Sequence, residues 1–332
     1  MDRMILESSA REAATTARPG PGDEGWLRGI VPPVLTPFTS ELRVDEAGLQ
    51  RQIQRMLDAG VHGVFLLGTS GEGAYVTDDD RRRVIATAVE VVSGRVPLLV
   101  GAMAPSARQV AAMAATSAGR GVDALVCTTP FYGASHQGEV REHFRAIATS
   151  VDLPVVAYNI PGAAGVRMSP ELVAELADAR IITGYKDSGG DEYALRRTVA
   201  ACAPLEHFPV LSGSEVMVDS ALRLGAVGGV PGLANVSPRP YVELYDAASV
   251  GDLDRAQSIQ DRLIELFGIA RVADSSRMGN FSAGIGSFKA ALVALGVIES
   301  RALLAPLVTL NDHEAEAVAA HLAHFDLEDI AS

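Results

Sequence analysis

The chain has 332 residues, of which 48% are hydrophobic and 21% are charged, with 32 glycines, 17 prolines and two cysteines. This balance is typical of a globular protein with a sizeable core, and it excludes a collagen-like, coiled-coil or wholly disordered chain. The net charge is −13 at pH 7. Because so acidic a chain repels phosphate, we expect no nucleic-acid partner. We expect no membrane partner either, since no apolar run reaches the roughly 18 residues of a membrane span.

Residues 1–26 mix small polar residues with proline and glycine, and we interpret them as a flexible N-terminal leader. They lack the basic cap, apolar stretch and cleavage site of a secretory signal peptide. Cys127 and Cys202 are interpreted as two small buried residues, because two cysteines make neither a disulfide framework nor a cysteine zinc site. A reducing, cytoplasmic location is therefore expected.

After the leader, short apolar runs alternate with amphipathic stretches. The apolar runs are Ile30–Leu35, Gly63–Leu67, Pro97–Gly101, Ala124–Thr128, Pro154–Tyr158, Ile181–Lys186, Pro209–Ser212 and Gly228–Gly232. The runs do not alternate apolar with polar residues, so both faces of each strand should be buried, as in a parallel sheet.

Helical periodicity fills the intervals between these runs. The predicted helices are Glu46–Ala59, Asp78–Val92, Ala107–Gly119, Gly138–Ser150, Pro170–Ala177, Asp191–Cys202, Glu215–Leu224 and Pro238–Ala248. Buried strands alternating with helices in this way predict an α/β fold, a (β/α)8 TIM barrel over residues 27–250. A doubly wound sheet also alternates, but it usually opens with a glycine-rich turn, whereas Thr36-Pro37-Phe38 follows the first run here. Residues 251–332 are predicted to form a C-terminal helical extension packed on the barrel.

Catalytic residues of TIM barrels lie at the C-terminal ends of strands, and the sixth predicted strand ends in a lysine. Lys186 and Lys289 are the only lysines in the chain. Arginine stays protonated, whereas a desolvated lysine can attack a carbonyl carbon. The alternative for Lys186 is an ion pair with a carboxylate such as the adjacent Asp187. Lys289 lies in a helical pattern, and we expect a solvated or snorkelling side chain there.

Two further strand ends carry polar residues suited to chemistry. Tyr158 ends the fifth strand, so its phenol should share a barrel mouth with Lys186 and exchange protons there, with a packed tyrosine as the alternative. The loop Gly68–Gly73 sets Thr69 and Ser70 among glycines, which suits the binding of a carboxylate or phosphate, with a tight turn as the alternative. The chain lacks a P-loop, a nucleophile elbow and a strand-end cluster of histidines and carboxylates, so we expect no metal.

In order and spacing, the motifs from about Gly29 to Leu310 resemble the dihydrodipicolinate synthase/N-acetylneuraminate lyase superfamily of Schiff-base pyruvate aldolases. The matching motifs are G-T-S-G-E at Gly68–Glu72, T-P-F-Y at Thr129–Tyr132, Y-N-I-P at Tyr158–Pro161, G-Y-K-D-S-G-G-D at Gly184–Asp191, L-S-G-S-E at Leu211–Glu215, L-G-A-V-G-G-V at Leu224–Val230 and A-N-V at Ala234–Val236. Each motif is short, but together they are specific.

The resemblance implies that Lys186 forms an imine with pyruvate or another 2-keto acid, with no metal or other cofactor. The imine would serve either to condense pyruvate with an aldehyde or to cleave a larger 2-keto acid into these two. Tyr158 would move protons in a relay with Thr69 and with Tyr132 of a neighbouring subunit. The active unit would then be a dimer, and the family usually assembles a dimer of dimers, a homotetramer. The residues that the resemblance places at the substrate are Ser70, Gly71, Ser188, Ala163 and Val230.

The resemblance leaves the second substrate open. Dihydrodipicolinate synthases carry an arginine two residues after the proline of Y-N-x-P, and Ala163 occupies that position here. The bidentate grip on a dicarboxylic partner is therefore lost. K-D-S-G-G-D at Lys186–Asp191 looks more like a 4-hydroxy-2-oxoglutarate aldolase, with Ser188 facing the distal part of the substrate, and Asp187 counts against a sialic acid lyase. The synthase itself and a sugar-acid aldolase or dehydratase remain alternatives.

Two readings from other classes also remain. A barrel enzyme acting on a phosphorylated sugar would use the loops after the seventh and eighth strands, where Gly213-Ser214 and Gly228-Gly229 lie. A non-catalytic, ligand-binding barrel is the other alternative, although Lys186, Tyr158, Thr69 and Tyr132 are all present.

Overall fold

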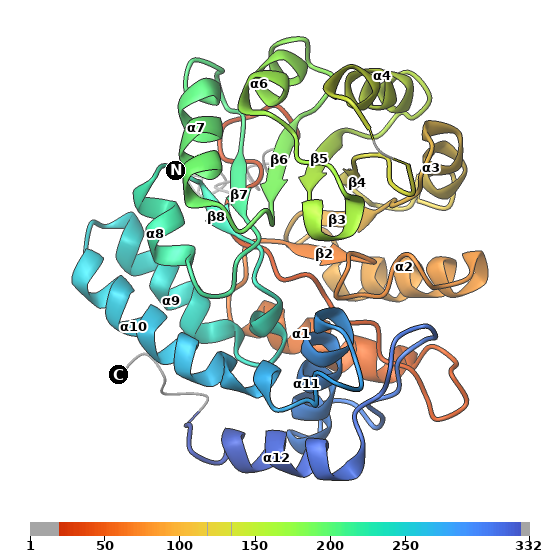
Figure 1. Cartoon of the computed structure of the whole chain (residues 1–332), viewed down its shortest axis with the longest axis vertical. Coiled ribbons are helices and arrows are strands. Elements are labelled where there is room, and N and C mark those ends of the chain that lie inside the picture. Colours follow the sequence, from red (N-terminus) through yellow and green to blue (C-terminus); the bar gives the residue numbers. More distant parts are fainter. Residues whose placement is uncertain (1–19, 118, 134, 327–332) are drawn as a thin grey trace, which may run out of the picture.

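The computed structural model describes residues 20–117, 119–133 and 135–326, so residues 1–19 of the expected leader lie outside it. Eight parallel strands follow one another around a single sheet in the order β1-β8-β7-β6-β5-β4-β3-β2. The strands are β1 (Gly29–Ile30), β2 (Val64–Leu66), β3 (Leu98–Gly101), β4 (Ala124–Thr128), β5 (Val155–Asn159), β6 (Gly184–Asp187), β7 (Val210–Ser212) and β8 (Gly228–Gly229). A parallel bridge between Pro33 and Phe65 joins the remaining edge beside β1 to β2. The predicted TIM barrel is confirmed (Figure 1).

Every strand residue is buried, as the continuous apolar runs predicted. Phe65, Val126, Val156 and Leu211 fill the barrel interior, and Trp26 joins the same apolar cluster. The first and last strands are shorter than predicted. β1 stops at Ile30 because the following Val31 leads into Pro32 and Pro33, which have no N–H to donate to a ladder.

Helices surround the sheet. They are α1 (Glu46–Asp58), α2 (Asp78–Val92), α3 (Ala107–Ala114), α4 (Gln137–Ala148), α5 (Pro161–Ala164), α6 (Pro170–Asp178), α7 (Glu192–Cys202), α8 (Val218–Arg223), the 3-10 helix η1 (Gly232–Asn235) and α9 (Pro238–Ser249). α3 is shorter than predicted, and the short α5 was not predicted. α8 begins three residues after the predicted start at Glu215, because the Ser214 side chain accepts from the Val216 amide and holds a turn there.

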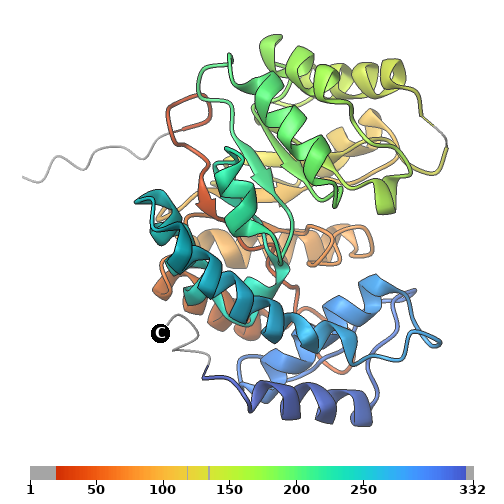
Figure 2. The ribbon, with the colours of Figure 1, turned by 60° about the vertical axis from the view of Figure 1, so that its left-hand side comes forward.

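The chain ends in helices packed on one side of the barrel. They are α10 (Leu253–Leu266), the 3-10 helix η2 (Phe267–Arg271), α11 (Asn280–Ala294) and α12 (Asp312–Leu322). Figures 1 and 2 both place α11 and α12 side by side, below the barrel. Ile259, Ile285 and Val318 from these helices belong to one apolar cluster with Leu49 and Val84 of the barrel helices, so the two parts share a core. In the described part of the chain, no helix is both long enough and apolar enough to span a membrane.

Lys289 corrects one expectation of the sequence. Its side chain is not solvated but fully buried, and its amine pairs with Glu72 at 2.5 Å. The helix periodicity missed this because α11 is buried on most of its surface, so a charged position does not mark an outer face. The two cysteines are unpaired and buried, as predicted, and burial raises the pKa of Cys127 to about 12 and that of Cys202 to about 11.

Candidate active site

Lys186 lies on β6 with its side chain in the barrel. It is 6% exposed, and its amine lies 3.9 Å from the centre of the Tyr158 ring and 5.3 Å from that of Phe65. Among the described residues, no carboxylate pairs with this amine. A lysine that is buried against aromatic rings and has no ion-pair partner is suited to nucleophilic attack on a carbonyl.

Asp187, the carboxylate expected as the alternative partner of Lys186, is engaged elsewhere. One of its oxygens accepts from the Asn159 side-chain amide at 2.7 Å and from the Gly189 amide at 2.8 Å. Burial raises the pKa of Asp187, while these two hydrogen bonds oppose the change. Because neighbouring side chains of a strand point to opposite faces, Asp187 cannot follow Lys186 into the barrel interior.

Tyr158 is the direct neighbour of Lys186 across the β5–β6 ladder, as the strand order predicted. Its hydroxyl lies 3.2 Å from the Thr69 hydroxyl, so the two side chains share a hydrogen bond. Tyr158 is almost fully buried. The three predicted residues Lys186, Tyr158 and Thr69 therefore meet at one place, at the C-terminal ends of β2, β5 and β6.

The loop after β2 divides the other predicted residues. Thr69 and Ser70 line the cavity above Lys186. Gly71 is buried behind them, and its carbonyl accepts from the Thr36 hydroxyl at 2.7 Å. A Cβ at Gly71 would lie 2.8 Å from the Val34 carbonyl oxygen, so this position needs glycine for backbone packing. Gly71 thus shapes the loop and does not line the cavity.

The cavity above Lys186, which we call the Lys186 cavity, has a volume of about 410 Å³. Its lining combines polar and apolar residues. The polar ones include Ser188, Ser212, Ser214 and Glu215, and the apolar ones include Val230, Ile160, Phe267, Phe281, Ile285 and Phe288. Among the described lining residues Lys186 is the only basic one, whereas Asp187, Asp191, Glu192 and Glu215 are acidic.

Glu215, the last residue of the L-S-G-S-E motif, also lines the cavity, and the motif alone gave it no role. One carboxyl oxygen accepts from the Gly232 amide at 3.1 Å. Its backbone carbonyl accepts from the Tyr241 hydroxyl at 2.8 Å and the Gln260 side chain at 3.1 Å, which fixes its place. Burial raises the pKa of Glu215, and the positive charge of Lys186 acts in the opposite direction. Its position just after the seventh strand was the signal that could have identified it.

Ala163 and Tyr132 lie outside this cavity. Ala163 lines a neighbouring cavity of about 630 Å³. The two cavities share Thr69, Ile160, Phe281 and Ile285. Tyr132 is fully exposed and has a left-handed backbone conformation, with φ of 82°. Within one chain, the structure therefore does not bring Tyr132 to Lys186. Among the residues that the structure describes, no three His, Cys, Asp or Glu side chains are grouped so as to hold a metal ion.

Similar proteins share the whole architecture. The chain is 38% identical to an uncharacterized DapA-like lyase of Halobacterium salinarum, over 93% of this chain and 97% of that protein. It is 35% identical to a 4-hydroxy-tetrahydrodipicolinate synthase of Methanopyrus kandleri, over 72% of this chain and 80% of that protein. The structure of YagE, an E. coli K12 prophage protein of the dihydrodipicolinic acid synthase family in complex with pyruvate, matches with a TM-score of 0.83. That match has 29% identity and covers 91% of this chain and 99% of YagE.

The family match extends across the barrel and the C-terminal helices. The model of the dihydrodipicolinate synthetase family matches residues 26–325, which include every strand and every helix described above. The matched region contains Lys186, Tyr158 and Thr69. The chain belongs to the dihydrodipicolinate synthetase family, whose members include aldolases and lyases.

Proposed function

We propose that this protein is a class I pyruvate aldolase in which Lys186 forms the imine. One observation carries the proposal: the amine of Lys186 stands without an ion-pair partner at the base of a cavity, against Tyr158, whose hydroxyl bonds Thr69 at 3.2 Å. Nucleophile, proton carrier and its hydrogen-bond partner are thus assembled in one chain.

The chemistry follows from these three groups. The amine of Lys186 adds to C2 of pyruvate and water leaves, which gives the imine. Loss of a C3 proton gives an enamine, whose C3 attacks the aldehyde carbon. The aldehyde oxygen takes up a proton, and water then hydrolyses the imine to release the product and the amine. Tyr158 would transfer the protons, while Thr69 and Ser70 would hold the carboxylate of pyruvate.

The cavity lining supports a neutral, hydroxylated aldehyde as the partner. Ser188, Ser212 and Ser214 offer hydroxyls, and Glu215 offers a carboxyl group that binds hydroxyls. The acidic lining as a whole disfavours a second carboxylate or a phosphate. A sugar-acid aldolase or dehydratase is therefore favoured over a 4-hydroxy-2-oxoglutarate aldolase and over an enzyme for phosphorylated sugars. With Ala163 at the position of the synthase arginine, the lining also offers no support for the 4-hydroxy-tetrahydrodipicolinate synthase reaction.

The exposed Tyr132 supports a shared active site. A tyrosine that is fully exposed and held at positive φ has no packing role in its own chain. The second cavity beside Thr69 would receive Tyr132 of a second copy of the chain and complete the relay. We propose a dimer as the active unit and a dimer of dimers as the assembly. The unpaired, buried cysteines fit the reducing cytoplasm as its location.

The first experiment traps the imine. Incubation with pyruvate and borohydride should add about 72 Da to the intact protein, and peptide mapping should place the adduct on Lys186. Lys186→Ala should give no adduct and no turnover, whereas Lys289→Met should still be trapped at Lys186. A folded wild-type protein without an adduct would contradict the proposal and favour the non-catalytic barrel. A panel of aldehydes added to pyruvate then tests the partner, with glyceraldehyde expected to react faster than glyoxylate.

A further inference from the structure

The second lysine of the chain forms a fully buried ion pair with the catalytic loop. Lys289 on α11 and Glu72 in the loop after β2 both have side chains that are 0% exposed, and their charged atoms lie 2.5 Å apart. The amine of Lys289 also donates to the Ala302 carbonyl at 2.8 Å. The second carboxylate oxygen of Glu72 accepts from the Leu304 amide at 2.7 Å. One side chain of the loop thus joins α11 and the segment that follows it.

Stability alone does not account for such a pair. Burying two charges costs several kcal/mol each, and a buried ion pair often contributes no more than apolar residues of similar volume would. An ion pair of this geometry does fix the position of the two elements that it joins, here the loop after β2 and α11.

The loop around Glu72 is held in a conformation that it would not adopt alone. Glu72 has φ of 56°, in the left-handed region that is unfavourable for residues with a side chain. Gly73 passes so close to Leu67 that a Cβ would lie 1.8 Å from its carbonyl oxygen. The buried guanidinium of Arg81 donates to the Gly73 carbonyl at 3.2 Å and to the Gly101 carbonyl at 2.7 Å. Contacts on both sides therefore maintain this path of the backbone.

The same loop carries a proton-relay residue. The Glu72 amide donates to the Thr69 carbonyl at 3.1 Å, so a shift of Glu72 moves Thr69 directly. The Thr69 hydroxyl is the partner of Tyr158 at 3.2 Å. Helix α11, which carries Lys289, supplies Phe281 and Ile285 to the lining of the Lys186 cavity. The ion pair thus joins two elements that both line the cavity in which the substrate would lie.

We propose that Glu72 and Lys289 are positioning residues that fix the loop after β2 against α11 and so keep Thr69 within hydrogen-bond reach of Tyr158. This inference rests on the proposed function, because it assigns the pair a role in the proton transfers of that reaction. Neither residue lines the Lys186 cavity, and Glu72 borders the neighbouring cavity together with Thr69. We assign both an indirect role, through Thr69.

The test separates imine formation from proton transfer and needs pyruvate alone. The extent of borohydride trapping at saturating pyruvate reports on Lys186. The exchange of the C3 hydrogens of pyruvate for deuterium, followed by NMR, reports on proton transfer. For Glu72→Gln and Lys289→Met we expect the exchange rate to fall by roughly ten- to a hundredfold, as small misplacements of catalytic groups do, while Lys186 is still trapped.

A double-mutant cycle tests the route through Thr69. Thr69→Val should slow exchange strongly in the wild-type protein and only slightly in the Lys289→Met protein, because the second change has already displaced the hydroxyl. Distant sites that act independently give additive effects. Additive effects of Thr69→Val and Lys289→Met would therefore overturn the proposal, as would a wild-type exchange rate in a folded Lys289→Met protein.

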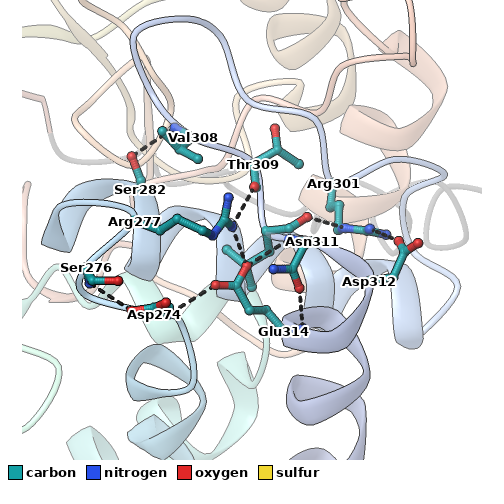
Figure 3. Close-up of polar contacts among 11 residues, drawn as sticks. Asp274, Ser276, Arg277, Ser282, Arg301, Val308, Thr309, Asn311, Asp312 and Glu314 are labelled. Atoms are coloured by element: carbon teal, nitrogen blue, oxygen red, sulfur yellow. Dashed lines mark hydrogen bonds and ion pairs between the residues drawn. The ribbon is translucent and has the colours of Figure 1, made fainter.

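The control variant removes a different ion pair in the C-terminal part of the chain, between Arg277 and Glu314, which is only partly buried. Arg277 donates to the Glu314 carboxylate at 2.6 Å, and the same carboxylate accepts from the Asp274 amide at 3.0 Å and the Asn311 amide at 2.8 Å (Figure 3). Glu314 and Asn311 belong to α12 and its N-cap, and Asp274 and Arg277 lie in the segment before α11. Among the described residues, no hydrogen bond or ion pair joins them to the loop after β2. Arg277→Met should lower the melting temperature and leave exchange and trapping unchanged.

The double variant Glu72→Gln with Lys289→Met guards against loss of folding. It removes both charges and keeps similar side-chain volumes, so its stability should lie close to that of the wild type. Slowed exchange in this folded protein supports positioning, and unchanged exchange overturns it. Failure of the wild-type protein itself to trap pyruvate is a different result, because it refutes the proposed function before any variant is compared.

Discussion

The carboxyl group of Glu215 has a pKa that the fold raises above its ordinary value of 4.5, because burial disfavours the charged form. A carboxyl whose pKa is higher in the folded than in the unfolded chain takes up a proton on folding. Its contribution to stability is therefore greatest at low pH and is lost as pH rises from 4.5 through the folded value. Because Glu215 also lines the Lys186 cavity, we infer that its side chain serves substrate binding more than stability.

Glu215→Gln tests this inference. The free energy of unfolding should rise relative to the wild type near neutral pH and not at low pH, because the glutamine carries no charge to bury. The kcat/KM for a hydroxylated aldehyde should fall by roughly tenfold or more, as loss of a hydrogen bond to a charged group does. Denaturation curves at several pH values check the first point and kinetics the second. Glu316→Gln, at an exposed position on α12, should alter neither.

At the scale of elements, Asn235 on η1 joins the segments that follow the first and the last strand of the barrel. Its side-chain oxygen accepts from the Leu35 amide at 3.0 Å and from Gln52 at 2.6 Å. Its side-chain nitrogen donates to the carbonyls of Pro33 at 3.0 Å and Gly232 at 2.7 Å. All these groups are buried, so the segment after β1 and the segment after β8 depend on one amide for their hydrogen bonds.

Asn235→Ala should therefore lower the free energy of unfolding by roughly 3 kcal/mol, because it leaves several buried polar groups without partners. Chemical denaturation measures this value. Gln54→Ala, on the outer side of α1, should change it by only about 0.5 kcal/mol. A small effect of Asn235→Ala would show that water or a shifted backbone replaces the lost bonds and that the amide is not what joins these elements.

At the scale of the whole molecule, the position of Tyr132 predicts that active sites are shared between chains. Lys186→Ala lacks the proposed nucleophile, and Tyr132→Phe lacks the proposed relay hydroxyl, so each variant alone should be weakly active or inactive. In a symmetric dimer each site would take Lys186 from one chain and Tyr132 from the other. Mixing the two variants should then restore intact sites, up to about a quarter of the total in a randomly assorted dimer population.

The measurement is turnover after the two variants are unfolded and refolded together, compared with each refolded alone. Lys186→Ala refolded with wild-type chains is the matched control for subunit exchange. No gain of activity in a mixture that has formed mixed dimers would place Tyr132 outside the relay. The outcome does not depend on which aldehyde is used, provided that one aldehyde gives turnover with the wild type.

The placement of the strand-end residues could be predicted from the sequence, because in a parallel barrel it depends on local pattern. Continuous apolar runs specify strands buried on both faces, and the residue that ends each run must lie at the same rim. Tyr158 and Lys186 therefore became neighbours as soon as the fifth and sixth runs were paired. The motif spacing that resembles the family depends on the same regular alternation.

Contacts between distant segments could not be predicted in this way. The burial of Lys289, the hydrogen bond from Asn159 to Asp187 and the place of Gly71 depend on separate segments of the chain. A lysine in a helical pattern is usually solvated, and only the approach of Glu72, 217 residues away, makes its burial tolerable. The apolar lining residues from α11 were missed for the same reason, because the C-terminal helices carry no catalytic motif.

The sequence by itself determined the barrel, the identity of the strand-end residues and the family. These follow from periodicity and from short motifs whose order is written in the chain. Only the tertiary structure decided that Lys186 has no ion-pair partner among the described residues, that Glu215 lines the cavity and that Glu72 and Lys289 join two elements that line it. The physical reason is that burial and pairing of charges are properties of three-dimensional packing, in which residues from many segments together set the environment of each group.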